Sequence, residues 1–211
     1  LYGRLDDANV VQARQDFDPI DRFLWAALNF AASFNGGPLF EPPKYLTDYY
    51  TDEAVKVIET NKDRPFFLYL AHWAPHTPLQ ASREDYEALS NIELHRERVY
   101  AAMIRSLDRG VGRVMQALKD NGLDEKTLVM FTSDNGGAGY IGLPDVNEPY
   151  RGWKITLFEG GIRVPFWHAG QLVCRPAQHS MRRFITLICT LQPLRLRERN
   201  CRRIEPSTAR I

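Results

Sequence analysis

Two short apolar segments on either side of one long amphipathic helix most constrain the fold of this chain. Residues 66–71 (FFLYLA) and 127–132 (TLVMFT) are apolar over most of their length and are bounded by polar or proline-containing sequence. Between them, apolar side chains recur every three or four positions over residues 99–118, and Asn121 and Gly122 then end the pattern. Near-continuous apolar strands joined by a helix are typical of parallel pairing in a buried sheet. We therefore predict an α/β fold with helices on both faces of the sheet.

Three further elements complete this prediction. An amphipathic helix is expected over residues 47–61, where Thr47 offers an N-cap and apolar residues recur every four positions. A third strand is expected over residues 162–167, which again form a short apolar segment. The first 43 residues have little periodicity, so they are predicted to be loop with one short helix near residues 23–28.

The charge of the chain changes sign near position 167. The whole sequence carries a net charge of +1 over 211 residues. Residues 1–167 hold 18 Lys and Arg against 24 Asp and Glu, whereas residues 168–211 hold nine Arg against two Glu. We therefore predict a boundary at residue 167, between a mildly acidic segment over 1–167 and an atypical Arg-rich tail over 168–211. Our hypothesis for the tail is a change of reading frame or of splice pattern around residues 166–168.

The tail has a rival interpretation as a nucleic-acid-binding arm, because its net charge is +7. Residues 184–188 (FITLI) are more apolar than a solvated basic arm, so we expect no nucleic-acid partner. All three cysteines also lie in the tail, and their spacing predicts neither a disulfide framework nor a cysteine metal site. No stretch approaches the ~20 apolar residues needed to cross a bilayer, which predicts no membrane span.

A histidine between two prolines follows the first predicted strand. His76 lies in the loop 74–80 (APHTPLQ), and ligands of an open α/β sheet collect beyond the carboxyl ends of its strands. A fixed imidazole can bind an anion or donate a proton to a leaving oxygen. The alternative interpretation is a loop histidine that only satisfies backbone groups.

The second predicted strand runs into a loop that offers hard oxygen ligands. Asp134 and Asn135 precede two glycines in residues 132–137 (TSDNGG), and a carboxylate beside a carboxamide suits Ca²⁺ or Mg²⁺. Because Ca²⁺ takes ~6–8 oxygen ligands, two or three from this loop make an incomplete site. Asp-Asn-Gly is also common turn sequence, which is the alternative interpretation.

A lysine in a largely apolar segment is the third candidate. Lys154 lies in residues 151–158 (RGWKITLF), and its compact charge suits an oxygen of a sulfate or phosphate group. The alternative interpretation is a lysine that pairs with Glu159. Glu159 and Arg163 are four residues apart and flank two glycines, so we expect them to form a structural ion pair.

Several motifs occur in an order that is similar to one enzyme family. They are residues 66–70 (FFLYL), 74–78 (APHTP), 132–136 (TSDNG), 151–154 (RGWK) and 159–165 (EGGIRVP). This combination resembles the type I sulfatases, the arylsulfatase family of sulfuric-ester hydrolases, over about residues 45–166. The resemblance implies that residues 1–167 are part of a sulfatase catalytic domain. It also implies an alkaline-phosphatase-like three-layer α/β/α sandwich, of which this chain holds an incomplete part. It also implies a Ca²⁺ site, with Mg²⁺ as the other candidate ion, and a secreted, periplasmic or lysosomal location.

The resemblance assigns a role to each candidate residue. His76 matches the family histidine that contacts the sulfate or its leaving oxygen, and Lys154 matches the lysine that binds the sulfate. Asp134 and Asn135 match two metal ligands. A cation, a lysine and a histidine aimed at the sulfuryl oxygens would stabilise the charge of the transition state.

The chain departs from the family pattern at the nucleophile. Family members carry a C-x-P-S-R type motif upstream of the histidine loop, where its Cys or Ser is oxidised to formylglycine, together with a pair of metal-binding Asp residues. Here the one lookalike, residues 174–178 (CRPAQ), lacks the Ser and Arg and follows the Asp134 loop. We therefore expect formylglycine in the parent enzyme but not in this chain, which is predicted to be inactive by itself.

The predicted function is thus that of a sulfatase fragment whose complete parent hydrolyses a sulfate ester with the help of a metal ion. Two alternatives stay open at this point. One is a phosphodiesterase or phosphonate hydrolase of the same superfamily, and the other is a non-catalytic truncated product.

Overall fold

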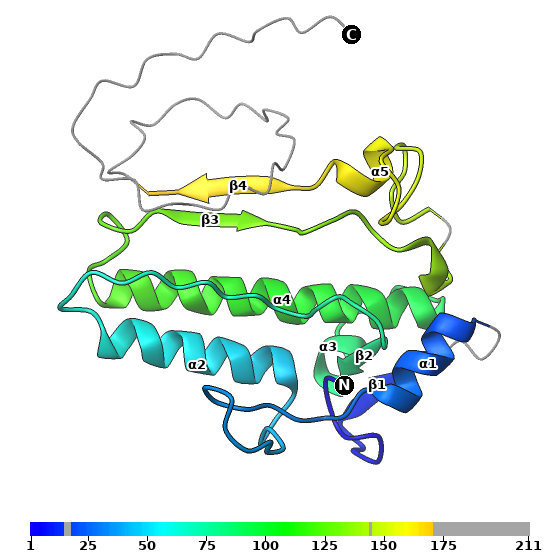
Figure 1. Cartoon of the computed structure of the whole chain (residues 1–211), viewed down its shortest axis with the longest axis horizontal. Coiled ribbons are helices and arrows are strands. Elements are labelled where there is room, and N and C mark those ends of the chain that lie inside the picture. The colour runs from blue at the N-terminus through cyan, green and yellow to red at the C-terminus, as the bar shows by residue number, and fades with distance from the viewer. Residues whose placement is uncertain (15–17, 144, 171–211) are drawn as a thin grey trace, which may run out of the picture.

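The structure is a computed structural model, and it describes residues 1–14, 18–143 and 145–170. Two of its helices pack side by side. Helix α2 (Leu46–Thr60) lies along helix α4 (His95–Asp120), and strands β3 (Val129–Thr132) and β4 (Phe166–Ala169) lie on the opposite side of α4 (Figure 1). The extended segment 65–79, which connects α2 to β2, runs along α4.

Smaller elements surround the N-terminal half of α4. They are β1 (Val10–Gln12), α1 (Pro19–Ala27), β2 (Gln80–Ser82) and α3 (Arg83–Glu87). Strands β1 and β2 pair antiparallel, with Val10 opposite Ser82. Beyond β3 the chain forms the short 3₁₀ helix η1 (Gly139–Ile141) and the single turn α5 (Glu159–Ile162) before it returns as β4.

The helix predictions are confirmed, because they depend on local sequence signals. Helix α4 ends at Asp120, where Asn121 is the C-cap and Gly122 takes a positive φ of 64°. Helix α1 begins after Asp18, whose side chain accepts hydrogen bonds from the backbone of Ile20 and Asp21. The N-cap prediction for α2 is wrong: the helix begins at Leu46, and its N-cap Tyr45 makes no side-chain capping bond.

The parallel pairing predicted between residues 66–71 and 127–132 is not seen among the described residues. Strands β3 and β4 pair antiparallel, with Val129 opposite Ala169 and Thr132 opposite Phe166. Their connection explains this direction, because the described residues between 133 and 165 form no crossover helix and the chain returns along β3. The third strand also starts later than predicted, since Ile162 belongs to α5.

Residues 66–71 differ from the prediction as well. They are extended, but in the described part of the chain they belong to no sheet. What the structure shows is a mixed helix and sheet unit, and the three-layer sandwich stays a prediction for the complete domain. The proposed boundary at residue 167 also stays a prediction. The lookalike motif at 174–178, the apolar stretch at 184–188 and the three cysteines lie outside the described residues.

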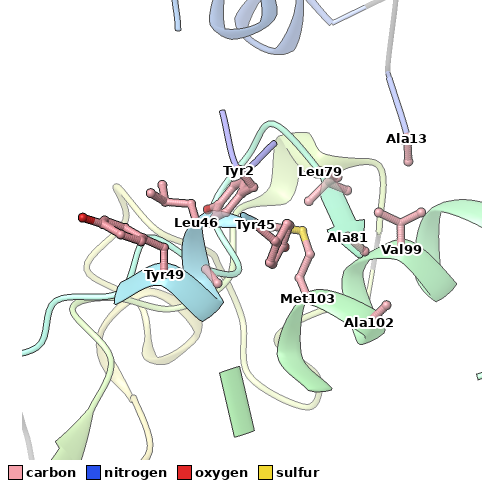
Figure 2. Packing of buried hydrophobic residues seen from close by; sticks show 11 residues of the cluster. Tyr2, Ala13, Tyr45, Leu46, Tyr49, Leu79, Ala81, Val99, Ala102 and Met103 are labelled. Carbon is pink, nitrogen blue, oxygen red and sulfur yellow. The ribbon is translucent and has the colours of Figure 1, made fainter. Parts of the chain in front are cut away.

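The main core lies between the N-terminal segment, α2, β2 and α4. The Tyr2 and Tyr45 rings stack with their centroids 5.9 Å apart, and Met103 of α4 points toward them (Figure 2). Leu79 and Val99 are fully buried in the same cluster. A second cluster joins the far ends of the helices through Ile58, Ala117 and Leu118, against which half-buried apolar residues pack.

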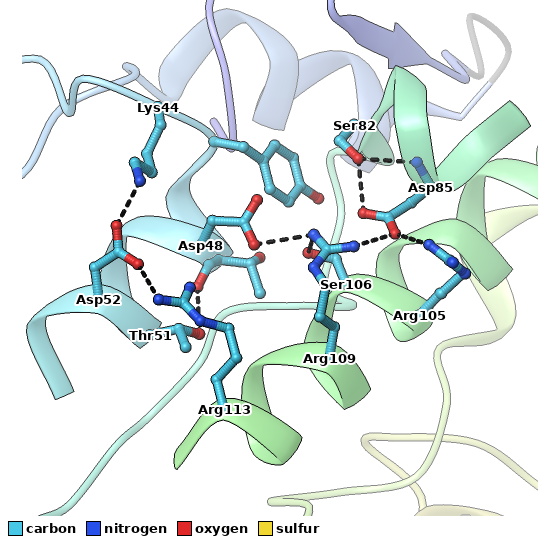
Figure 3. A network of polar contacts seen from close by, with 12 residues as sticks. Lys44, Asp48, Thr51, Asp52, Ser82, Asp85, Arg105, Ser106, Arg109 and Arg113 are labelled. Carbon is cyan, nitrogen blue, oxygen red and sulfur yellow. Dashed lines mark hydrogen bonds and ion pairs between the residues drawn. The ribbon is translucent and has the colours of Figure 1, made fainter. Parts of the chain in front are cut away.

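A polar network ties α2, α3 and α4 together (Figure 3). The buried carboxylate of Asp85 accepts hydrogen bonds from Arg105, from Arg109 and, at 2.7 Å, from the Ser82 hydroxyl. Arg109 also bonds Asp48 of α2 at 3.0 Å. Burial alone would raise the pKa of Asp85, but the hydrogen bonds from Arg109, Ser82 and Arg105 outweigh it and hold that pKa below its usual value.

Candidate functional site

The candidate residues lie in three loops, two of which follow extended segments. His76 lies in the loop between residues 66–71 and β2, and Asp134 and Asn135 follow directly after β3. Lys154 lies in the long connection between η1 and α5. The site is therefore built from loops, and its geometry depends on the contacts that fix each loop to its neighbours.

The central contact of the site joins His76 to Lys154. The Lys154 Nζ lies 3.1 Å from the His76 Nε2, although the two residues are 78 positions apart. The other ring nitrogen, His76 Nδ1, lies 2.6 Å from the backbone carbonyl of Thr77. Because a carbonyl can only accept, Nδ1 carries a proton, and a neutral imidazole then accepts a hydrogen bond from Lys154 at Nε2.

The backbone of His76 is fixed from two sides. Its N–H donates to the Trp73 carbonyl at 2.8 Å, and its own carbonyl accepts a 2.9 Å hydrogen bond from the Tyr2 hydroxyl. Tyr2 is buried in the main core, and burial raises the pKa of its phenol, which keeps the hydroxyl a neutral donor. The His76 loop is thus anchored to the core by a residue that sequence analysis missed, because a lone tyrosine gives no local signal.

Lys154 is held by an aromatic ring as well as by its backbone. Its Nζ lies 5.1 Å from the centroid of the Tyr140 ring, within the range of a cation–π contact. The Tyr140 ring packs edge-on against Trp153 with centroids 6.0 Å apart. Sequence analysis missed Tyr140 too. Among the described residues Lys154 forms no ion pair, whereas Glu159 pairs with Arg163 at 2.8 Å as predicted.

The lysine is presented on a tight turn. The Thr156 N–H donates to the Trp153 carbonyl at 3.0 Å, which closes a four-residue turn around Lys154 and Ile155. Ile155 has a φ of +83°, the value that the third residue of a type II turn requires. A β-branched residue is strained in this region, so the surrounding hydrogen bonds must hold the turn in place.

The loop after β3 packs closely against the turn α5 (Glu159–Ile162). Its Gly136 N–H donates to the Gly161 carbonyl at 2.9 Å, and a Cβ at Gly136 would lie only 1.8 Å from the Gly160 carbonyl oxygen. Only glycine fits this close backbone approach. The Lys154 N–H also donates to the Gly137 carbonyl at 3.1 Å, so the two loops that hold Asp134 and Lys154 are directly bonded.

Asp134 and Asn135 offer oxygen ligands at an exposed position. The Asn135 carboxamide donates to Asp134 Oδ1 at 3.0 Å, and the Ser133 hydroxyl donates to the Asn135 carbonyl at 2.9 Å. Their donor chemistry suits a hard cation. The described residues contain no group of three or more His, Cys, Asp or Glu that could hold a metal ion, so these two residues would supply only part of a coordination sphere.

Comparison with known proteins identifies the family. The protein-family model for sulfatases matches residues 5–179, and the chain therefore belongs to the sulfatase family. It is 38% identical to the sulfatase YdeN of Escherichia coli (strain K12), over 67% of this chain and 27% of that protein. It is also 38% identical to arylsulfatase J of Mus musculus, over 68% of this chain and 25% of that protein.

Solved structures agree with this assignment. The crystal structure of Ps i-CgsB in complex with k-i-k-neocarrahexaose superposes with a TM-score of 0.60 and 41% identity, covering 64% of this chain and 30% of that chain. The chain thus spans only about a quarter to a third of the length of the relatives that it matches. None of the helices in the described residues is long and apolar enough to cross a membrane.

Proposed function

We propose that this chain provides the sulfate-binding part of a sulfatase active centre, whose complete enzyme hydrolyses a sulfate ester with the help of a divalent metal ion. The observation that carries this proposal is the 3.1 Å contact between Lys154 Nζ and His76 Nε2. Two anion-binding side chains from distant loops meet at one point, beside the loop that holds Asp134.

Lys154 is assigned to the sulfate group. An ammonium has three donors, and His76 uses one of them, which leaves two for sulfuryl oxygens. Charge builds up on those oxygens during transfer, and a fixed cation stabilises the transition state electrostatically. His76 is assigned to the leaving oxygen. Its neutral ring accepts from Lys154 at Nε2, so donation of a proton from Nε2 to the leaving oxygen requires the doubly protonated imidazole.

Asp134 and Asn135 are assigned to the metal ion, with Ca²⁺ as the first candidate and Mg²⁺ as the second. The bound ion would add positive charge opposite the sulfate oxygens. A full Ca²⁺ shell of ~6–8 oxygens needs ligands from beyond these two residues. We therefore expect the isolated chain to bind Ca²⁺ weakly, and a micromolar affinity measured by calorimetry would contradict that expectation.

The nucleophile of the complete enzyme is proposed to be formylglycine. The C-x-P-S-R motif that is oxidised in the family does not occur in these 211 residues. The isolated chain is therefore expected to show no turnover, and hydrolysis of an aryl sulfate by the purified chain would overturn that expectation. The sulfatase relatives do not favour the phosphodiesterase and phosphonate hydrolase alternatives.

The substrate is proposed to be a sulfate ester of an aryl or carbohydrate group. Relatives are named as arylsulfatase J and N-acetylgalactosamine-6-sulfatase, and one solved relative contains a bound neocarrahexaose. The secreted, periplasmic or lysosomal location implied by the family stays a prediction, which fractionation of the source cells would test.

The direct test is a titration of the 211-residue chain with inorganic sulfate, followed through the NMR signals of the His76 ring and the Lys154 side chain. We expect both signals to shift together and to saturate, and Lys154→Ala to raise the sulfate concentration at which the His76 signal saturates. Chloride at the same ionic strength is the control for screening. A sulfate titration that shifts neither signal would refute the proposal.

A further inference from the structure

One asparagine side chain bonds both loops that hold the candidate residues. The Asn147 carboxamide accepts a hydrogen bond from the Gly137 N–H at 2.7 Å and donates to the Gly137 carbonyl at 2.9 Å. Its Nδ2 also lies 3.3 Å from the Gly152 carbonyl, in hydrogen-bonding range. Gly137 ends the loop that begins at Asp134, and Gly152 precedes Lys154 by two residues.

The Gly137 carbonyl is shared by two donors. It accepts the Asn147 side chain at 2.9 Å and the Lys154 backbone N–H at 3.1 Å. The position of Gly137 therefore sets where the turn with Lys154 begins, and Asn147 fixes both polar groups of Gly137. Gly137 also packs tightly against residues 146 and 147, because a Cβ at Gly137 would lie 2.9 Å from Val146 and 3.0 Å from Asn147 Oδ1.

The chemistry of these contacts requires a carboxamide. The site offers one backbone donor and two carbonyl acceptors, and only an amide side chain can accept from the first and donate to the others. An aspartate at this position would keep the bond from the Gly137 N–H but would place a carboxylate against two carbonyl oxygens. An alanine would leave all three half-buried backbone groups without this partner.

We propose that Asn147 is a positioning residue: it holds the Asp134 loop and the Lys154 turn in register, so that Lys154 Nζ stays against His76 Nε2. The inference rests on the proposed function, in which Lys154 and His76 bind the sulfate group. Asn147 itself touches neither of these side chains and acts through Gly137 and Gly152. Ile155 adds to the need for such a residue, because its positive φ is strained and neighbouring contacts must stabilise the turn.

The test compares the sulfate affinity of Asn147→Ala with that of a matched control, both in the 211-residue chain. Asn121→Ala removes a similar bond, from the side chain to the Ala117 carbonyl at 2.8 Å, but at the end of α4 away from the site. We expect Asn147→Ala to weaken inorganic sulfate binding by five-fold or more, and Asn121→Ala to leave it unchanged. Equal affinities of the two variants would overturn the proposal.

A double-mutant cycle separates positioning from general loosening of the loops. If Asn147 acts through Lys154, Asn147→Ala has no further effect on sulfate binding once Lys154 is replaced by Ala. An equal loss in both backgrounds would overturn the proposal. Asn147→Ser, which keeps one hydrogen-bonding group, replaces Asn147→Ala if the latter does not fold. A wild-type chain that binds no sulfate would instead refute the proposed function, so the two failures are distinct.

Discussion

Gly110 of α4 lies directly against Thr51 of α2: a Cβ at Gly110 would come within 2.6 Å of the Thr51 hydroxyl oxygen. Thr51 cannot turn away freely, because it is fully buried and its hydroxyl donates to the Thr47 carbonyl at 2.9 Å. The missing side chain therefore sets how closely the two helices approach. The segment 65–79, which includes His76, runs along α4 of this pair (Figure 1).

The contact predicts opposite effects for two glycines of the same helix. Gly110→Ala is expected to destabilise the chain by about 1–2 kcal/mol, since overpacking outweighs the gain in helix propensity. Gly112→Ala is the matched control: no atom lies within 4 Å of its added Cβ, so it should stabilise the chain by about 0.5–1 kcal/mol. Urea unfolding of both variants measures this, and a stabilised Gly110→Ala would contradict the packing.

The buried Asp85 carboxylate predicts a loss of stability in acid. Its pKa is lowered in the folded chain, so the stability it adds is complete above its ordinary pKa of 3.8 and is lost as the pH falls through the lower folded value. Asp85→Asn should flatten this decline below about pH 4. At neutral pH it should cost about 2–3 kcal/mol, less than for a fully buried pair because both arginines are partly exposed.

Denaturant unfolding at several pH values tests the Asp85 prediction. Asp52→Asn is a control from the same network, because Asp52 is also paired with basic side chains, at 2.5 Å to Lys44 and 2.7 Å to Arg113, but is partly exposed. The control should cost less than about 1 kcal/mol at neutral pH. If both variants lost the same free energy of unfolding, burial would not increase the contribution of Asp85 to stability.

The buried His72 predicts a second loss of stability on acidification, which begins at a higher pH than the loss due to Asp85. Both of its ring nitrogens are buried, and neither has a hydrogen-bond partner among the described residues. Burial lowers the pKa of this imidazole, an effect that the nearby Asp48 charge partly opposes. The folded chain therefore binds the proton less tightly than the unfolded chain. The stability that the neutral His72 ring contributes is complete above its ordinary pKa of 6.5, and it falls as the pH drops toward the lower pKa of the folded chain.

The variant that tests this is His72→Phe. It keeps an aromatic ring beside Tyr50, whose centroid lies 6.4 Å away, and it removes the titrating group. We expect its free energy of unfolding to change less between pH 7.5 and 5.5 than that of the wild-type chain. An unchanged pH dependence would assign the effect to another group.

The elements predicted correctly from the sequence are those set by local signals. The periodicity of α4 and the Asn121-Gly122 stop are confirmed, because helix hydrogen bonds and caps join residues close in sequence. The antiparallel pairing of β3 with β4 was not predicted, because it depends on how the chain returns from Thr132 to Phe166. The His76 and Lys154 motifs were recognisable from sequence, whereas Tyr2 and Asn147 act through backbone contacts that leave no pattern.

The segment 66–71 keeps the alternation of a strand although its backbone bonds no other described residue. Phe66 and Leu68 pack against the cluster around Leu118, whereas Phe67 and Tyr69 are 82% and 81% exposed. An unpaired extended segment with an exposed apolar face is a template for association with other chains. We therefore expect the isolated chain to self-associate through this face.

Neighbouring residues of this segment should respond in opposite ways to substitution. Leu68→Ala removes packing on α4 and should cost about 1–3 kcal/mol, below the range for a fully buried leucine. Phe67→Lys should change the free energy of unfolding by less than about 0.5 kcal/mol, because the side chain makes little contact with the folded chain. It should also reduce self-association measured by sedimentation, since a charge on an exposed strand opposes edge-to-edge pairing. If Phe67→Lys instead unfolded the chain while Leu68→Ala did not, the exposed and packed faces of the segment would be reversed.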